Sequence, residues 1–153
     1  AAAGLPLNKA IVSEVILALG CIPLAPYATP GTPELTKMFE PLVPNYDAIL
    51  MANHGVVTYG QDLLTAFFRM ETVEHFAQIS RVTEMLGKQA LLSGRDVEKL
   101  LAARVRYGTV TASQVGPQCP VTSESEAAGR VSITRQELEA LIEEAVRKDR
   151  AGR

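Results

Sequence analysis

The sequence predicts an α/β fold, and three observations lead to this prediction. Residues 46–60 consist of an apolar run, a polar corner and a second, β-branched apolar run, which is the pattern of two strands joined by a tight bend. Residues 62–86 carry apolar side chains at helical spacing over the longest periodic stretch of the chain. With 153 residues, 47% of them hydrophobic, the chain is long enough to form one compact domain with a core.

A histidine occupies the corner between the two predicted strands. Asn53 and Gly55 flank His54, and both residue types tolerate positive φ, so the corner can bend sharply and hold the imidazole in a defined direction. A histidine at a stiff strand end is well placed to bind a metal ion. The alternative interpretation is that His54 is an ordinary turn residue with a hydrogen-bonded ring nitrogen.

Upstream of this corner, we expect a helix followed by an edge strand. Asn8 is the predicted cap of the helix, whose apolar positions run to Leu19 and whose end is Gly20. Residues 22–27 contain two prolines, which exclude a helix or a central strand but permit an extended edge strand.

Two further helices flank the strand pair. Thr32 is the predicted cap of a short helix with Pro33 in its first position, and Pro41 ends it. After the strand pair, the long helix is expected to bury one apolar stripe, which includes Leu63, Phe67, Met70, Val73 and Ala77.

The last helix of the predicted domain is capped by Ser93 and covers residues 96–106, and the domain, residues 1–108, ends beside it. The first residues lack an initiator methionine and a helix cap, so we expect the chain to begin inside a folded unit.

The tail has a different composition. Residues 109–132 are rich in Thr, Ser, Gly and Pro and predict a flexible linker. Residues 133–150 predict a separate amphipathic helix with a capping box at Thr134 and Glu137. Its stripe consists of Leu138, Leu141, Ile142, Ala145 and Val146. A helix this short is marginally stable alone in water, so we expect it to pack on its own domain or on another protein.

Composition restricts the partners. The net charge of −2 and the dispersed basic residues argue against nucleic acid or an anionic membrane, and no apolar run is long enough to cross a bilayer. Cys21 and Cys119 lie far apart with no metal-type spacing, which favours a reducing, cytoplasmic compartment over a disulfide-held secreted scaffold. The expected partners are therefore small molecules or proteins.

Four motifs in order resemble the C-terminal half of the class II aldolase and adducin family, nearest its fuculose-1-phosphate aldolase branch. They are residues 22–32, residues 53–57, the long helix with Glu74, and residues 106–108. The resemblance implies a three-layer α/β/α fold with a mainly antiparallel sheet, of which this chain is a partial domain. It also implies a homotetramer.

The resemblance also implies a metal site. In the family, the histidine equivalent to His54 is the third zinc ligand, and the other two form a pair that would lie before residue 1. The sequence has two histidines, whereas a catalytic zinc takes three protein ligands, so the chain is expected to hold part of a site. Zn²⁺ is the expected cofactor, with another divalent metal as the alternative.

The implied reaction is retro-aldol cleavage of a phosphorylated deoxyketose to dihydroxyacetone phosphate and lactaldehyde, with the metal as Lewis acid. Tyr107 matches a tyrosine that reaches a neighbouring subunit's site as a catalytic group, or it packs at a subunit boundary. Glu74 is expected behind the metal corner, or in a structural ion pair. The alternative functions are a sugar-phosphate 4-epimerase of the same fold and a non-catalytic adducin-like interaction module.

The tail resembles the encapsulation peptides of bacterial microcompartments. This resemblance implies that Leu138, Leu141, Ile142 and Val146 dock on a shell protein, which would place the enzyme in a microcompartment lumen. The alternative is that the helix folds back onto its own domain.

Overall fold

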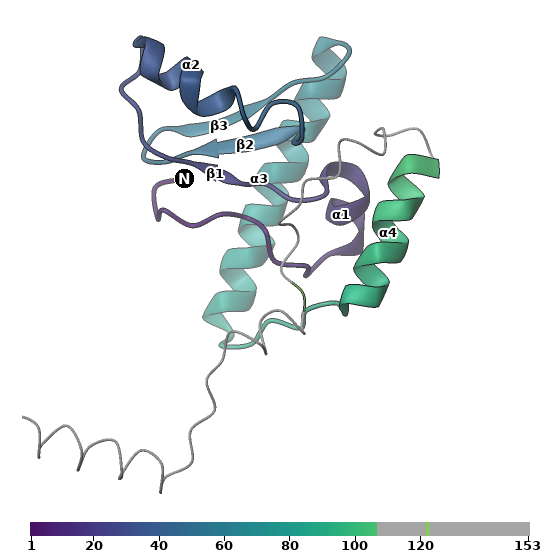
Figure 1. The fold of residues 1–153 in the computed structure, drawn as a ribbon. Helices are drawn as coiled ribbons and strands as arrows, with labels where there is room; N and C mark the ends of the chain where they lie inside the picture. The colour runs from purple at the N-terminus through teal and green to yellow at the C-terminus, as the bar shows by residue number, and fades with distance from the viewer. Residues whose placement is uncertain (107–121, 123–153) are drawn as a thin grey trace, which may run out of the picture.

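The computed structural model describes residues 1–106 and Thr122. In chain order, the described elements are α1 (Ser13–Leu19), β1 (Leu24–Ala25), α2 (Pro33–Phe39), β2 (Ala48–Met51), β3 (Gly55–Thr58), α3 (Leu63–Met85) and α4 (Gly94–Arg106) (Figure 1). The predicted linker, apart from Thr122, and the predicted tail helix lie outside the described residues. No helix within the described part is both long and apolar enough to span a membrane.

The strands form one small mixed sheet in the order β1-β2-β3. β1 pairs with β2 in parallel, with Leu24 opposite Leu50, and β2 pairs with β3 antiparallel, with Leu50 opposite Val56. The predicted strand pair and edge strand are confirmed. The connection through α2 returns the chain in the same direction and makes the pairing of β1 with β2 parallel. The described sheet is mixed, with four antiparallel residue pairs and two parallel ones, and the expectation of a mainly antiparallel sheet for the whole domain stays a prediction. The three-layer arrangement stays a prediction.

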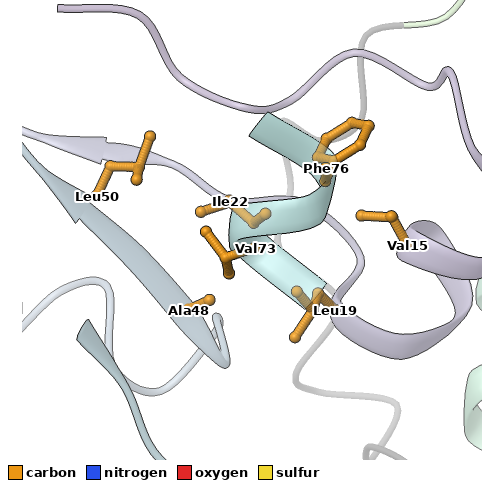
Figure 2. Packing of buried hydrophobic residues seen from close by; sticks show 7 residues of the cluster. All are labelled: Val15, Leu19, Ile22, Ala48, Leu50, Val73 and Phe76. Atoms are coloured by element: carbon orange, nitrogen blue, oxygen red, sulfur yellow. The ribbon is translucent and has the colours of Figure 1, made fainter. Parts of the chain in front are cut away.

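The main core lies between the sheet, α1 and α3. Figure 2 shows side chains from these elements pointing toward one another, with Phe76 and Val73 of α3 facing Leu19 and Ile22. The buried members are Val15, Leu19, Ile22, Ala48, Leu50, Val73 and Phe76. A smaller cluster of Ala10, Ile16 and Val97 joins α1 to α4. The core therefore fixes α3 beneath β2, and α1 against both long helices (Figure 1).

The first helix begins later than the sequence predicts. Asn8 is not its cap, since α1 starts at Ser13 after Val12, whose side chain makes no capping hydrogen bond. The reason is a β-bridge just upstream, in which Leu7 and Ile22 exchange backbone hydrogen bonds of 3.0 and 3.2 Å. This bridge keeps the backbone extended where the cap was expected. The predicted stop at Gly20 is confirmed, with φ of 77°.

The cap predicted for α4 is confirmed, the cap predicted for α2 is not, and α3 has a cap that was not predicted from the sequence. Asp62 caps α3, and its carboxylate accepts the Thr65 N–H at 2.7 Å. Ser93 caps α4, because its hydroxyl oxygen accepts the Asp96 N–H at 3.2 Å. α2 starts with Pro33 and ends before Pro41, as expected. The hydroxyl of Thr32, however, donates to the Thr29 carbonyl at 2.7 Å instead of capping the helix.

The predicted stripe of α3 is only partly buried. Val73 is buried, and Phe76 joins it, while Leu63 and Phe67 in the first two turns are exposed. The prediction that the stripe is buried is therefore confirmed only where α3 crosses α1 and β2 (Figure 2). Cys21, which follows α1, is buried, with 3% of its surface exposed.

Candidate functional site

His54 lies on the sharp corner between β2 and β3. Its backbone N–H donates to the Met51 carbonyl at 3.1 Å, and Asn53 has φ of 57°, in the left-handed region that asparagine tolerates. The Asn53 N–H also donates to the carbonyl of Ala1 at 3.4 Å, which ties the corner to the start of the chain. The His54 side chain is exposed. The geometry confirms the predicted corner, which presents an accessible imidazole on a fixed backbone.

The residues described around His54 do not complete a metal site. Within residues 1–106, no group of three or more His, Cys, Asp or Glu side chains is positioned to hold a metal ion. The other histidine, His75, is exposed on α3. A zinc site takes three or four protein ligands, and the described residues do not bring that number together, so the ligand role of His54 stays a prediction.

The other predicted site residues fall into two groups. Glu74 is exposed on α3, and its carboxylate accepts a hydrogen bond from the Gln78 side-chain amide at 3.1 Å. Its expected place behind the metal corner stays a prediction. The remaining predicted residues lie outside the described residues, and they are Tyr107, Leu138, Leu141, Ile142 and Val146.

Sequence reasoning missed a charged network at the opposite end of the strand pair from His54. Asp47, just before β2, forms an ion pair with Arg69 of α3 at 3.1 Å and accepts a charged hydrogen bond from Arg104 of α4 at 3.0 Å. The side chain of Arg104 is 3% exposed and that of Asp47 is 13% exposed. Arg69 also donates to the carbonyl of Tyr59, just after β3. The network therefore ties both strands, at the end of the pair away from the corner, to α3, and connects β2 to α4.

Arg104 is also bonded to the end of α1. Its Nε donates to the Leu17 carbonyl at 3.0 Å and its Nη2 to the Ala18 carbonyl at 3.3 Å. A Cβ atom on Gly20 would lie 2.5 Å from Nη1 of Arg104, so a residue without a side chain is required at this helix end. Burial lowers the pKa of Arg104, while the charge of Asp47 opposes that change.

A sequence signal for this network exists. Val97, Leu101 and Arg104 recur at helical spacing along α4, so an arginine sits where the apolar face of an amphipathic helix continues. A charged residue at such a position must find a partner when it is buried. The identity of that partner, Asp47, depends on how α4 packs against α1 and β2, which periodicity does not give.

Tyr59 borders the network and should make stability depend on alkaline pH. Its hydroxyl donates to the Val43 carbonyl at 2.6 Å, and burial, followed by the charge of Asp47, raises its pKa above 10.0. The unfolded chain therefore loses this proton first as pH rises. The stabilisation is fully present below pH 10.0 and is lost as pH rises through the pKa of the folded state.

We expect Tyr59→Phe to flatten the fall in the free energy of unfolding above pH 10.0, measured by urea denaturation across an alkaline pH series. Tyr27→Phe, at a tyrosine that is 58% exposed, is the matched control and should keep the slope of the unaltered protein. Equal slopes for Tyr59→Phe and the unaltered protein would contradict the assignment.

Comparison with known proteins places these elements in context. Residues 2–80, which include α1 through most of α3, match the Class II Aldolase and Adducin N-terminal domain. Over 71 residues, the chain is 35% identical to a 3-oxo-tetronate 4-phosphate decarboxylase of Pectobacterium atrosepticum, covering 46% of this chain and 33% of that protein. Over 85 residues, it is 35% identical to a 5-deoxy-D-ribulose 1-phosphate aldolase of Bacillus thuringiensis, covering 55% of this chain and 39% of that protein.

A solved structure shares the arrangement of the described elements. The structure of an L-fuculose 1-phosphate aldolase superposes with a TM-score of 0.60 at 31% identity, covering 66% of this chain and 47% of that one. The chain thus spans between 33% and 39% of the length of the two curated relatives named above, and less than half of the length of this structure.

Proposed function

This chain belongs to the class II aldolase and adducin family, and on that premise we propose that it contributes to a metal-dependent lyase that cleaves a carbon–carbon bond of a phosphorylated keto sugar. The observation that carries the proposal is the exposed imidazole of His54 on its fixed corner, inside the part of the chain that matches the family. The names of the matched decarboxylase and aldolases each specify a phosphorylated substrate, which supports the same substrate class.

Aldol cleavage of a fuculose-1-phosphate-type substrate to dihydroxyacetone phosphate and lactaldehyde is the first candidate reaction. Breaking the bond leaves an electron pair on the carbon beside the carbonyl, so the carbonyl must be polarised. A bound Zn²⁺, or another divalent ion, supplies that polarisation as a Lewis acid. His54 has one role here, which is to donate the lone pair of a neutral ring nitrogen as one of several ligands, and the rigid corner keeps that nitrogen in place.

Decarboxylation of a phosphorylated 3-oxo acid is the second candidate reaction. The 35% identity to the Pectobacterium atrosepticum decarboxylase favours it. Loss of carbon dioxide from such an acid also leaves an electron pair on the carbon beside a carbonyl, so the two reactions require the same polarisation. They differ in the leaving group, which is an aldehyde in one case and carbon dioxide in the other.

The proposal also covers the assembly of the subunits and the partner of the tail. We propose a homotetramer, in which Tyr107 serves the site of a neighbouring subunit. A tyrosine that donates a proton to a leaving group accelerates the reaction by a factor of about 100 or more, so Tyr107→Phe tests that role by its effect on kcat. The resemblance of residues 109–153 to encapsulation peptides implies docking on a microcompartment shell protein, which is the alternative to docking of the tail helix on its own domain.

The test is a histidine substitution in the natural protein that carries this chain. We expect His54→Gln to remove most of the bound metal and to lower activity at least about 100-fold, because one imidazole ligand is lost. Metal content is measured by elemental analysis. Activity is measured both as release of dihydroxyacetone phosphate from ketose 1-phosphates and as release of carbon dioxide from a phosphorylated 3-oxo acid.

His75→Gln is the matched control, since it removes the other histidine, exposed on α3, by the same substitution. It should retain metal and activity. Metal content that is unchanged in His54→Gln would overturn the ligand role. A protein that carries no metal and has neither activity would instead indicate a non-catalytic adducin-like module, and the assay that responds decides between aldolase and decarboxylase.

A further inference from the structure

The first two turns of α3 carry a continuous apolar surface, which we call the apolar α3 face. It consists of Leu63, Leu64, Phe67 and Phe68, which are 87%, 61%, 53% and 54% exposed. The two phenylalanine rings contact each other edge to face, with centroids 6.0 Å apart. Single exposed apolar residues are ordinary, but four that adjoin on one helix face mark a surface that another chain segment covers.

Acidic residues border this face at both ends. Asp62 precedes it as the cap of α3, and Glu71 and Glu74 follow it on the same side of the helix, because residues three and four apart are neighbours on a helix surface. All three acidic side chains are exposed. Along α3 the order is therefore acid, apolar face, acid, and a matching occupant has the order base, apolar stripe, base.

The predicted tail helix has that complementary order. Arg135 precedes its apolar stripe and Lys148 follows it, and the stripe consists of Leu138, Leu141, Ile142, Ala145 and Val146. Arg135 and Lys148 lie 13 residues apart, and Asp62 and Glu74 lie 12 residues apart. At a helical rise of about 1.5 Å per residue, the two charge spacings agree to within about 2 Å.

We propose that residues 133–150 dock as a helix on the apolar α3 face of the same chain, antiparallel to α3. This orientation places Arg135 beside Glu74 and Lys148 beside Asp62. In this orientation the two helix dipoles are antiparallel, which is favourable. The partial negative charge at the C-terminal end of the tail helix lies near the partial positive charge at the N-terminal end of α3.

The length of the intervening chain favours docking within one molecule. Residues 107–132 separate α4 from the tail helix, and a flexible segment of that length has a root-mean-square span of about 28 Å. Linkage by such a segment gives an effective concentration in the millimolar range, which exceeds the concentration of a second copy in ordinary solution. Docking also covers the apolar stripe of a helix that is marginally stable alone.

The test is hydrogen–deuterium exchange on the full 153-residue chain, followed for residues 63–68 and 133–150. Both segments should be protected in the unaltered protein. Glu74→Arg and Arg135→Glu should each lower the protection of both segments about threefold, the size expected of an exposed charge pair. The double variant, which carries both substitutions, should restore the protection. Leu141→Asp should lower it more, by about 30-fold, because the stripe loses a buried leucine.

Glu98→Arg is the matched control, since it reverses an exposed charge on α4, and it should change nothing in either segment. Exchange in β2 reports that each variant is folded. Unprotected tail residues in the unaltered chain would overturn the proposal, as would a double variant that fails to restore the protection. Protection that rises with protein concentration would overturn the proposal, because it would indicate docking on a second copy of the chain. Protection that requires an added shell protein would overturn it as well, because it would indicate that the tail docks on the shell.

Discussion

Asp47→Ala is expected to lower the free energy of unfolding by about 3–5 kcal/mol. The substitution leaves the guanidinium of Arg104, which is 3% exposed, without its carboxylate partner. A buried charge that loses its partner costs more than the pair contributed, because the desolvation of the remaining ion is no longer offset. Arg69, whose side chain is 18% exposed, loses the same partner. Urea denaturation followed by circular dichroism measures the change.

The exposed ion pair of α4 provides the control for this experiment. Lys99→Ala removes the partner of Asp96 at 2.7 Å, but both side chains are more than half exposed, so the free energy of unfolding should hardly change. A loss in Asp47→Ala as small as that in Lys99→Ala would contradict a buried structural network. Arg104→Met, which removes the charge and keeps an unbranched apolar side chain, should be less destabilising than Asp47→Ala.

Phe76→Ala is the second substitution with a large expected effect, a loss of about 3–5 kcal/mol in the free energy of unfolding. Phe76 is 2% exposed and packs where α3 crosses α1 and the sheet, so its removal leaves a cavity that neighbouring side chains fill only partly (Figure 2). The measurement is again urea denaturation, with the midpoint and the slope reported separately.

Met85→Ala is the matched control on the same helix, because Met85 is 79% exposed at the end of α3. Its free energy of unfolding should stay within about 0.5 kcal/mol of the unaltered protein. If Phe76→Ala were equally mild, the contact between α3 and α1 would not be the centre of the core. If His54→Gln loses metal but keeps its free energy of unfolding, the His54 side chain does not contribute to the stability that the core provides.

The strand pair and its corner were predictable because their cause is local. Asn53 tolerates the left-handed backbone, Gly55 starts β3, and apolar runs on both sides form the strands. The confirmed stop at Gly20 and the cap at Ser93 have equally short-range causes. The family was predictable as well, because its motifs follow one another along the chain.

The start of α1 and the burial along α3 were not predictable in this way. The bridge between Leu7 and Ile22 joins residues distant in sequence and keeps Asn8 out of the helix. Periodicity locates the apolar stripe of α3, but only contact with α1 and β2 decides that Val73 is buried and Leu63 exposed. The candidate site has the same limit, because a single imidazole is visible in the sequence while a coordination shell is a property of folded geometry.

The sequence by itself determined the order and type of the elements, the corner that holds His54 and the family. Each depends on residue preferences within a few positions of the chain or on motifs in a fixed order. Only the tertiary structure decided the partner of Arg104, the parallel pairing of β1 with β2, and which turns of α3 are covered. Those features depend on contacts between segments far apart in the sequence, and the free energy of such contacts comes from burial and charge pairing that no local pattern encodes.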